Sequence, residues 1–357
     1  MLRTTIQAIE PLDATSMREA AERQAQLTKP AGSLGVLEQA SITLCGIQAT
    51  CPPVRLARPV VAVFAGDHGV HAQGVSPWPQ EVTAAMIENF RAGGAAVNVL
   101  ARHAGADVVV VDMGVAGDLA AGDFLMDHKI RRGTSDLATG PAMSRSEALR
   151  GLGAGILVAN DLADRGYDCF LTGDMGIANT TPSAALIAAF AGVEPETVTG
   201  RGAGADDASF TRKVEVLRTA LAQRPPGEDP VETLASMGGF EHAGIAGFIL
   251  AAAARRVPVI LDGVIAGAAA LVAYALAPVA MTYCYAGHRS AEPGHVVALD
   301  RLGLRPLVDL DLRLGEGTGA VLAFPIVEAA GATLREMATF DSAGVATKSG
   351  SGMRDRS

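Results

Sequence analysis

The stretch PVVAVFAGDHG, residues 59–69, indicates the fold class of this chain. Its first seven residues, 59–65, form a continuous apolar run rich in valine and alanine. Such a run is typical of a strand that is buried on both faces of a parallel sheet. The run ends in Gly66-Asp67-His68-Gly69, which predicts a loop at the carboxyl end of that strand.

The same pattern of strand and helix recurs along the chain. Further strands are predicted at Asp107–Met113, Cys169–Thr172, Val257–Asp262 and Met281–Ala286. Helices are predicted between and after them, at Pro79–His103, Ser144–Arg165, Pro182–Ala191 and Val264–Leu276. This alternation favours right-handed βαβ units and therefore an α/β fold with a mostly parallel sheet. Because such sheets bind ligands beyond the carboxyl ends of their strands, the glycine-rich loops that follow the strands are candidate site loops.

Composition excludes several classes of protein. The chain has 357 residues, of which 49% are hydrophobic, so it can bury a large core. Its net charge of -9 argues against a general nucleic-acid surface. The four cysteines show no CxxC spacing, which favours thiols in a reducing cytoplasm over a zinc or redox motif. The N-terminus, MLRTTIQAIEPLDA, lacks the apolar core of a signal peptide.

One segment, Gly244–Ala280, is apolar enough to raise the question of a membrane span. A spanning helix needs about 20 largely apolar residues in a row. The apolar runs of this segment are interrupted by Arg255, Arg256, Pro258 and Asp262. We therefore interpret it as a buried helix, a strand and a second buried helix.

Both ends of the chain carry helical patterns. Met17–Gln26 and Leu34–Ala49 are predicted helices in the first 58 residues, and Val321–Ala330 is an apolar helical stretch near the other end. The tail from Thr347 is polar and rich in glycine and serine, which predicts frayed chain.

The stretch RLGEGTGA, residues 313–320, is the strongest candidate for a reactive group. It places one carboxylate, Glu316, among glycines that let the backbone pass close to a ligand. Burial there would raise the pKa of the carboxyl and suit it to accept a proton near neutral pH. The alternative is a solvated glutamate in a helix-capping turn, and the motif alone does not decide between them.

Two loops near the first strand also carry chemistry-bearing residues. Asp67 and His68 lack a third ligand for a metal, so a structural or substrate-positioning use is favoured. Trp78 lies in GVSPWPQEVT between two prolines that stiffen the backbone. It can form the wall of a pocket for a planar ring, or simply pack at a helix start.

Three later loops have the composition of anion or ribose sites. GDMGIANTT (173–181) follows a strand and opens a helix, whose N–H groups attract anions, although a simple N-cap is the alternative. GRGAG (200–204) resembles a phosphate loop but lacks a P-loop ending, and Lys213 follows it on a predicted helix. GHRSAEPGH (287–295) offers hydroxyl and cationic groups beside glycines, as an ordinary polar loop also does. Because no GxSxG elbow is present, this inventory favours transfer of a phosphorylated sugar to a weakly acidic heterocycle over covalent catalysis.

These motifs together resemble the nicotinate-nucleotide–dimethylbenzimidazole phosphoribosyltransferases. The matching segments run in order over nearly the whole chain: KPAGSLGVLE (29–38), AGDHGV (65–70), SPWPQEVT (76–83), GGAAVNVLA (93–101), GPAMSR (140–145), GDMGIANTTPSAA (173–185), GGFEHAGIAG (238–247), PVILDG (258–263) and RLGEGTGAVLAFPIVEAA (313–330).

The resemblance implies a reaction and an architecture. The 5-phosphoribosyl group of nicotinate mononucleotide would pass to a nitrogen of 5,6-dimethylbenzimidazole with inversion at C1′, giving α-ribazole 5′-phosphate and nicotinate for cobalamin nucleotide-loop assembly. Relatives are homodimers with a Rossmann-like, mostly parallel sheet and a smaller helical domain. Here that small domain would comprise residues 1–58 plus roughly 325–357, and residues 59–324 would form the large α/β domain. The expected setting is the cytoplasm, without a metal, a cofactor, nucleic acid or a membrane span.

The resemblance also implies roles for individual residues. Glu316 matches the general base of the family. Asp174 matches a second acidic ligand, which is Glu in some relatives, so its carboxylate is set back by one methylene. Phosphate and ribose contacts match Gly176, Gly202, Lys213 and Ser290, and the wall of the base pocket matches Trp78, Met86 and Met175.

Two alternatives stay open on the sequence. The acceptor can be another benzimidazole, a purine or a phenol. The chain can also be a non-catalytic sensor that binds nicotinate mononucleotide without releasing nicotinate, although a sensor would have no need for the Glu316 loop.

Overall fold

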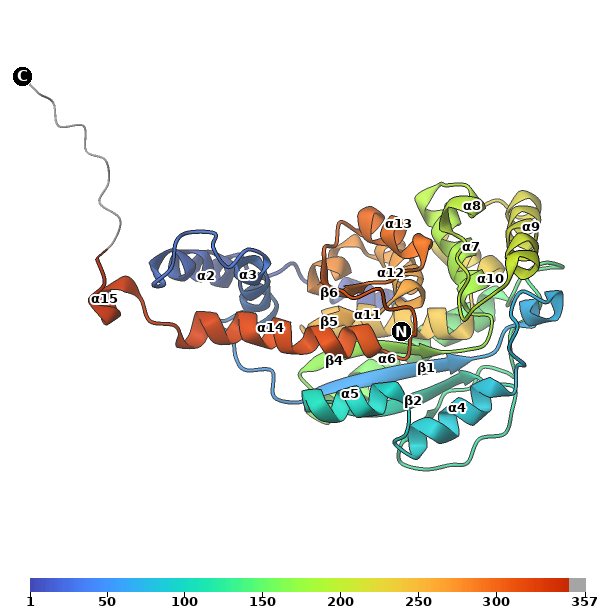
Figure 1. Ribbon diagram of the computed structural model, residues 1–357, viewed down its shortest axis with the longest axis horizontal. Coiled ribbons are helices and arrows are strands. Elements are labelled where there is room, and N and C mark those ends of the chain that lie inside the picture. The colour runs from blue at the N-terminus through green and yellow to red at the C-terminus, as the bar shows by residue number, and fades with distance from the viewer. Residues whose placement is uncertain (347–357) are drawn as a thin grey trace, which may run out of the picture. The chain divides into compact units, whose positions relative to one another are not determined.

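A seven-stranded sheet forms the centre of the protein (Figure 1). The computed structural model describes residues 1–346. Every pairing in the sheet is parallel, and the strand order is β3-β2-β1-β4-β5-β6-β7. The strands are β1 (Pro59–Gly66), β2 (Asp107–Gly114), β3 (Leu125–Asp127), β4 (Cys169–Met175), β5 (Val259–Leu261), β6 (Cys284–Arg289) and β7 (Pro306–Asp309). The predicted Rossmann-like α/β class is confirmed.

Strand β1 is an interior strand of the sheet, as its apolar run predicts. All eight of its residues are buried, and it pairs with β2 on one side and β4 on the other. The strand order reverses between β1 and β4, because β2 and β3 lie on one side and β4 to β7 on the other. A crevice for ligands is expected at this switch point, beyond the carboxyl ends of the strands.

Helices connect the successive strands and cover the sheet (Figure 1). The most buried of them, α11, packs against α6 and contacts β1, β2 and β4. The close approach depends on small residues, since a Cβ on Gly155 of α6 would run into the Gly244 carbonyl group of α11. The helices between the strands are α4 (Val82–Arg91), α5 (Ala96–Ala104), α6 (Arg145–Asp164), α7 (Thr180–Ala191), α8 (Pro195–Val198), α9 (Asp207–Gln223), α10 (Pro230–Met237), α11 (Phe240–Ala254), α12 (Val264–Leu276) and α13 (Pro293–Leu302), with 3-10 helices η1 (Gly69–Gln73) and η2 (Pro278–Tyr283).

The apolar segment 244–280 folds as predicted, into helix, strand and helix. Its residues form most of α11, all of β5 and all of α12, and most of them are buried in the core. Among residues 1–346, no helix is long and apolar enough to cross a membrane.

Two predicted elements differ from the structure, and two observed strands were not predicted. The helix predicted at Pro79–His103 is two helices, α4 and α5, because Gly93 takes a left-handed φ of 73° and turns the chain. The strand predicted from Met281 begins only at Cys284, after η2. The short edge strands β3 and β7 were not predicted, because neither has a buried apolar run.

The chain divides into two compact units. The larger contains Met1–Pro11 and Leu56–Pro325, and the smaller contains Leu12–Arg55 and, of the described residues, 326–346. The smaller unit includes α2 (Ala14–Gln26), α3 (Val36–Gln48) and α15 (Phe340–Ala343), and α14 (Thr318–Glu336) contributes residues to both units. Its core packs Ala20, Leu27, Cys45 and Leu334 together.

The first residues of the chain do not follow the predicted division at 58 and 325. Helix α1 (Leu2–Gln7) contacts α6 and α11, and the Tyr283 hydroxyl donates a hydrogen bond to the Glu10 carbonyl oxygen at 2.9 Å. These contacts place residues 1–11 in the larger unit, and residues 56–58 belong there as well. The prediction that the tail from Thr347 frays lies outside the described residues.

Candidate active site

A cavity of about 360 Å³ opens beyond the carboxyl ends of β1, β4, β5 and β6. Its walls come from the loops after these strands and from the segment 313–316. All nine predicted site residues line it, although they come from six separate parts of the chain: Trp78, Met86, Asp174, Met175, Gly176, Gly202, Lys213, Ser290 and Glu316.

Glu316 lies in a strained turn at the start of α14. Its φ is 64°, and the flanking Gly315 and Gly317 have φ values of 85° and 96°. Left-handed conformations of this kind are costly for a residue with a side chain and tend to occur at functional sites. The side chain is 6% exposed, and its Oε2 accepts a hydrogen bond of 3.3 Å from the Val97 N–H at the start of α5.

The environment of Glu316 favours the uncharged form of its carboxyl group. Burial raises the pKa of Glu316, and the nearby Asp262 carboxylate raises it further, against the single hydrogen bond from Val97. A carboxylate with a raised pKa is a stronger base than an ordinary glutamate. The buried, proton-accepting reading of the RLGEG motif is thus favoured over a solvated capping residue.

Asp174 lies at the end of β4, 5% exposed, in the same cavity. Asn179 Nδ2 donates a 2.9 Å hydrogen bond to its Oδ1, while Oδ2 has no partner within residues 1–346. Burial and the negative charge of Asp262 raise the pKa of Asp174 well above its usual range. A neutral carboxyl at this position can donate a hydrogen bond to a ligand as well as accept one.

Lys213 is a buried cationic group of the cavity, whose walls also include Arg201 and Arg313. Its Nζ donates to Thr180 Oγ1 at 3.0 Å and to the Gly200 carbonyl oxygen at 2.9 Å, and the residue is 1% exposed. Burial lowers the pKa of Lys213 to about 8, against the opposing effect of the Glu292 carboxylate. An ammonium group that is poorly solvated has much to gain from a phosphate.

The other predicted anion contacts line the same cavity as Lys213. The Gly202 N–H donates to Glu292 Oε1 at 2.8 Å, so this donor is already engaged by a carboxylate. Gly176 allows close backbone approach, because a Cβ there would run into the Gly66 carbonyl oxygen. The Ser290 N–H donates to His295 Nδ1 at 2.9 Å, and its Oγ accepts from the Glu292 N–H at 3.3 Å.

All three residues predicted to form an apolar wall line the cavity, and Trp78 differs from the two methionines because it is more exposed. Met86 and Met175 are both half-buried in the cavity. Trp78 is 50% exposed, and its indole N–H donates to the Ala203 carbonyl oxygen at 2.9 Å. Trp78 is therefore not packed in a core, and its hydrogen bond ties the loop after β1 to the loop 200–204.

The histidine of the GDHG motif lies outside the lining of this cavity. His68 Nε2 and His242 Nδ1 both lie 2.9 Å from Glu241 Oε1, and all three side chains are buried. Burial disfavours the imidazolium form, but the Glu241 carboxylate outweighs it and raises the pKa of His68. The Ser183 hydroxyl lies 2.8 Å from His242 Nε2, which continues the polar chain toward α7. A structural use of His68 fits this arrangement.

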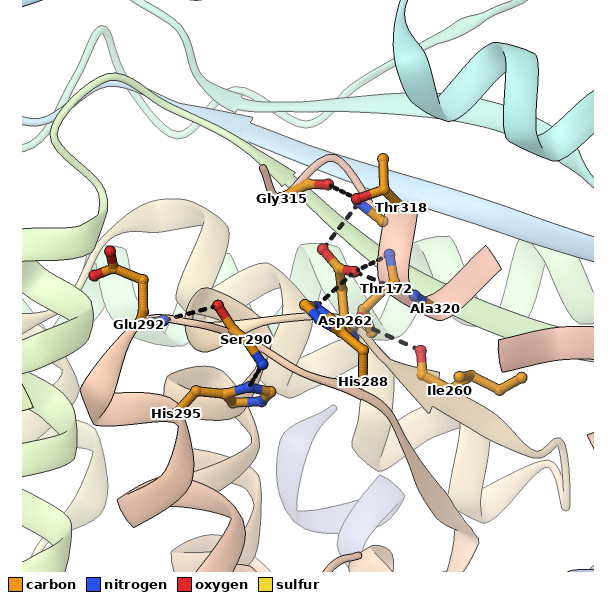
Figure 2. A network of polar contacts seen from close by, with 12 residues as sticks. Thr172, Ile260, Asp262, His288, Ser290, Glu292, His295, Gly315, Thr318 and Ala320 are labelled. Carbon is orange, nitrogen blue, oxygen red and sulfur yellow. Dashed lines mark hydrogen bonds and ion pairs between the residues drawn. The ribbon is translucent and has the colours of Figure 1, made fainter. Parts of the chain in front are cut away.

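Sequence reasoning missed several residues that shape the site. Glu292, Arg313 and Leu314 line the cavity, and Asp262 contacts the turn that carries Glu316. Figure 2 shows Asp262 between that turn and His288, with Ser290, Glu292 and His295 beside them. Asp262 is the last residue of the strand predicted at Val257–Asp262, and this place at a strand end is the one signal that marks it as a candidate.

The fold and this site define a phosphoribosyltransferase. The chain belongs to the phosphoribosyltransferase family DBI_PRT, whose model matches residues 9–345. It is 58% identical to the nicotinate-nucleotide–dimethylbenzimidazole phosphoribosyltransferase of Salinispora tropica, over 98% of this chain and 100% of that protein. It is 54% identical to the enzyme of the same name from Chloroflexus aggregans, over 98% of this chain and 99% of that one. The crystal structure of CobT from Thermus thermophilus is similar, with a TM-score of 0.91 at 47% identity over 94% of this chain and 100% of that one. The predicted family is confirmed.

Proposed function

We propose that this protein transfers the 5-phosphoribosyl group of nicotinate mononucleotide to 5,6-dimethylbenzimidazole, in cobalamin nucleotide-loop assembly. The products are α-ribazole 5′-phosphate and nicotinate. The observation that carries the proposal is that a buried carboxylate with a raised pKa, Glu316, and a buried ammonium group, Lys213, line one cavity. The names of the relatives described above support the choice of both substrates.

Glu316 is the proposed general base. One benzimidazole nitrogen attacks C1′ of the ribose while the other loses its proton to the Glu316 carboxylate. The bond between C1′ and the pyridinium nitrogen breaks. Its electron pair stays on that nitrogen, so nicotinate leaves with an uncharged pyridine ring. Without proton removal the new nucleoside would carry a positive charge in a largely apolar pocket, which is costly. Holding both rings in line with C1′ supplies much of the remaining acceleration.

The phosphate of the mononucleotide is proposed to bind at Lys213, with Gly176, Gly202 and Ser290 around it. Gly176 comes from the loop after β4, Gly202 from the loop between α8 and α9, Lys213 from α9 and Ser290 from the loop after β6. The Gly202 N–H donates a hydrogen bond to the Glu292 carboxylate in this structure, so a bound phosphate would compete with Glu292 for this N–H. Asp174 is the proposed contact for the ribose or the acceptor ring, through the oxygen that has no partner in residues 1–346.

The acceptor ring is proposed to lie against Met86, Met175 and Trp78. These side chains give the cavity a mainly apolar wall, and Trp78 is the most exposed of the three. Flexible methionine side chains adapt to planar rings of different shape, which suits a site that selects among related bases. The proposed chemistry requires neither a metal nor a cofactor.

A homodimer in the cytoplasm is the proposed working form. Within residues 1–346, which include all four cysteines, no disulfide bond is formed, as suits a reducing compartment. Sedimentation of the purified protein at micromolar concentration tests the dimer, and a monomer there contradicts it.

The decisive experiment mixes the purified protein with nicotinate mononucleotide and dimethylbenzimidazole. Chromatography and mass spectrometry should find equal amounts of free nicotinate and of the α-riboside phosphate, with or without a chelator. Binding of the mononucleotide without nicotinate release would instead identify a sensor. Release of nicotinate without the α-riboside would reject dimethylbenzimidazole as the acceptor.

A further inference from the structure

The Asp262 carboxylate holds the turn that carries Glu316. Asp262 directly follows β5 and is 0% exposed. Its Oδ2 accepts from the Gly317 N–H at 3.1 Å, and its Oδ1 accepts from the N–H groups of Gly319 and Ala320 at 2.7 and 3.2 Å. Figure 2 shows the carboxylate pointing at this turn from the neighbouring strand end.

These three donors are the groups that a helix start leaves without partners. The first N–H groups of an α-helix have no acceptor within the helix, and a side chain next to the first residue usually caps them. Here the cap comes from 55 to 58 residues away in sequence, and it carries a negative charge at the positive end of α14. Glu316 is thus attached to the sheet through a residue that is remote in the chain.

Asp262 is itself held by the neighbouring strands. Its N–H donates to Thr172 Oγ1 of β4 at 3.0 Å, and His288 Nε2 of β6 lies 3.6 Å from its Oδ1. Thr172 is fully buried and His288 is 2% exposed. The central strands β4, β5 and β6 therefore all contribute to the placement of one carboxylate.

We propose that Asp262 is a positioning residue for the reaction, which aims the Glu316 carboxylate by fixing the turn 315–320. The proposal rests on the proposed role of Glu316 as the base. The turn needs such a support because Glu316 has a φ of 64°, a conformation that a residue with a side chain leaves unless other contacts over-determine it. A carboxylate with two accepting oxygens satisfies the donors on both sides of Thr318 at once, which no neutral side chain does.

The charge of Asp262 has a second effect on the base. The ionisable groups that share the cavity walls with Glu316 are Asp174 at the end of β4, His288 in β6, Glu292 after β6, Lys213 on α9, Arg201 and Arg313, and Asp262 contacts the turn from the end of β5. Of these, Asp262 adds to burial in raising the pKa of Glu316. Removal of its charge should therefore weaken Glu316 as a base and also shift the pH at which it is protonated.

The test compares Asp262→Asn with the wild-type protein. The amide keeps one accepting oxygen but replaces the other with a donor that faces the Gly317 N–H. We expect kcat to fall about 10²-fold, as for a small misplacement of a reacting group. The dissociation constant of nicotinate mononucleotide should stay within about twofold, and the acid limb of the kcat–pH profile should move to lower pH.

A matched control separates this effect from the general cost of altering a buried carboxylate. Asp112→Asn changes a 2% exposed residue on β2 that also accepts a backbone N–H, from Val115 at 2.9 Å, and lies outside the cavity lining. It should leave kcat and the pH profile unchanged. Equal losses in the two variants, or a loss in Asp262→Asn that appears only in nucleotide binding, would overturn the proposal.

Failure of this inference and failure of the proposed function give different results. A wild-type protein that releases no nicotinate refutes the function, whatever the variants do. If the wild type is active, Asp262→Asn is also made in a Glu316→Gln background. Because Asp262 acts through Glu316, it should then cost less than about twofold in kcat. A full additional loss in that background shows that Asp262 acts by some other route.

A milder pair of variants decides the question if Asp262→Asn does not fold. Thr172→Val removes the hydroxyl that accepts the Asp262 N–H but preserves the side-chain shape, whereas Thr172→Ser keeps the hydroxyl. We expect about a tenfold lower kcat for valine, the equivalent of one hydrogen bond, and near wild-type kcat for serine. Equal kcat values in the two would reject Asp262 as the support of the turn.

Discussion

Gly173 of β4 lies directly against the backbone of Glu316, so that a Cβ on Gly173 would come 2.5 Å from the Glu316 carbonyl oxygen. The strand can therefore support the turn only because residue 173 has no side chain. Gly173→Ala should push the turn away and lower kcat about 10²-fold, with the affinity for nicotinate mononucleotide little changed. The control is Gly227→Ala, where a Cβ meets nothing within 4 Å. Wild-type kcat in Gly173→Ala would show that the turn does not depend on this contact.

Glu316→Gln should keep the fold and nucleotide binding but lose most turnover. A general base contributes about 10²–10⁴-fold, and that is the expected fall in kcat. The protonated form of Glu316 cannot accept a proton, so kcat of the wild type should fall as the pH decreases through the pKa of Glu316. Because this pKa is raised, the fall should occur above pH 4.5, the ordinary pKa of glutamate. Steady-state rates across pH measure both effects. Near-normal turnover in Glu316→Gln would reject Glu316 as the base.

Lys213→Met should raise KM for nicotinate mononucleotide about 10–100-fold, the equivalent of a hydrogen bond to a charged group. The pKa of Lys213 in the ligand-free protein is lowered to about 8, so the affinity for the nucleotide should weaken as pH rises through that value. Calorimetric titration across that pH measures this. Lys129→Met, which alters a lysine outside the cavity lining, is the control. The assignment of Lys213 to phosphate is wrong if its variant binds the nucleotide normally.

Met175→Ala should change which acceptor base is preferred. Loss of apolar contacts with the ring methyl groups should cost about 1–3 kcal/mol, a change of about 10–200-fold in the ratio of kcat/KM between dimethylbenzimidazole and unsubstituted benzimidazole. Competition assays with both bases measure the ratio. Met126→Ala, at a half-buried methionine on β3, should leave it unchanged. An unchanged ratio in Met175→Ala would place the acceptor ring elsewhere.

Glu241→Gln should lower the free energy of unfolding by about 3–5 kcal/mol, because it leaves two buried imidazoles without their anionic partner. The Glu241 carboxyl has a pKa far below its ordinary 4.5, so its contribution is present above that pH and is lost in acid. His68 has a pKa above its ordinary 6.5, so its contribution is complete below that pH and is lost as pH rises through the raised value. The variant should therefore differ most from wild type between about pH 4.5 and 6.5.

Urea denaturation at several pH values tests this last expectation. Glu147→Gln removes a partly exposed carboxylate that pairs with Arg131 at 2.7 Å, and it should cost about 1 kcal/mol or less. Equal costs for the two variants within that pH range would contradict the proposed strength of the buried histidine–glutamate cluster.

Much of the architecture was predictable because its signals are local. The run 59–65 has the length and composition of a central parallel strand, and the observed β1 is buried along its whole length. The apolar stretch Val264–Leu276 is helical at both predicted ends. By contrast, β3 and β7 are short edge strands that read as ordinary loop sequence. The sequence of residues 1–11 contains no local signal that predicts which of the two units they pack in.

The candidate site was predictable only in part. Family resemblance pointed to Glu316 and Lys213, and the structure places both in one cavity. The family resemblance did not predict that the Gly202 N–H donates a hydrogen bond to Glu292, because that contact joins residues 90 positions apart. The position of Trp78, half exposed and bonded to Ala203, likewise depends on a contact across 125 positions.

What the sequence by itself determined is the kind of element at each place and the chemistry each loop carries, because apolar period, glycine and the identity of a side chain are local properties. What only the tertiary structure decided is the state of those groups. Glu316 becomes a strong base, and Lys213 a weakly solvated cation, through burial and through neighbours such as Asp262 and Glu292 that the sheet brings to them. Those neighbours lie tens of residues away along the chain, and electrostatic interactions depend on distance in space.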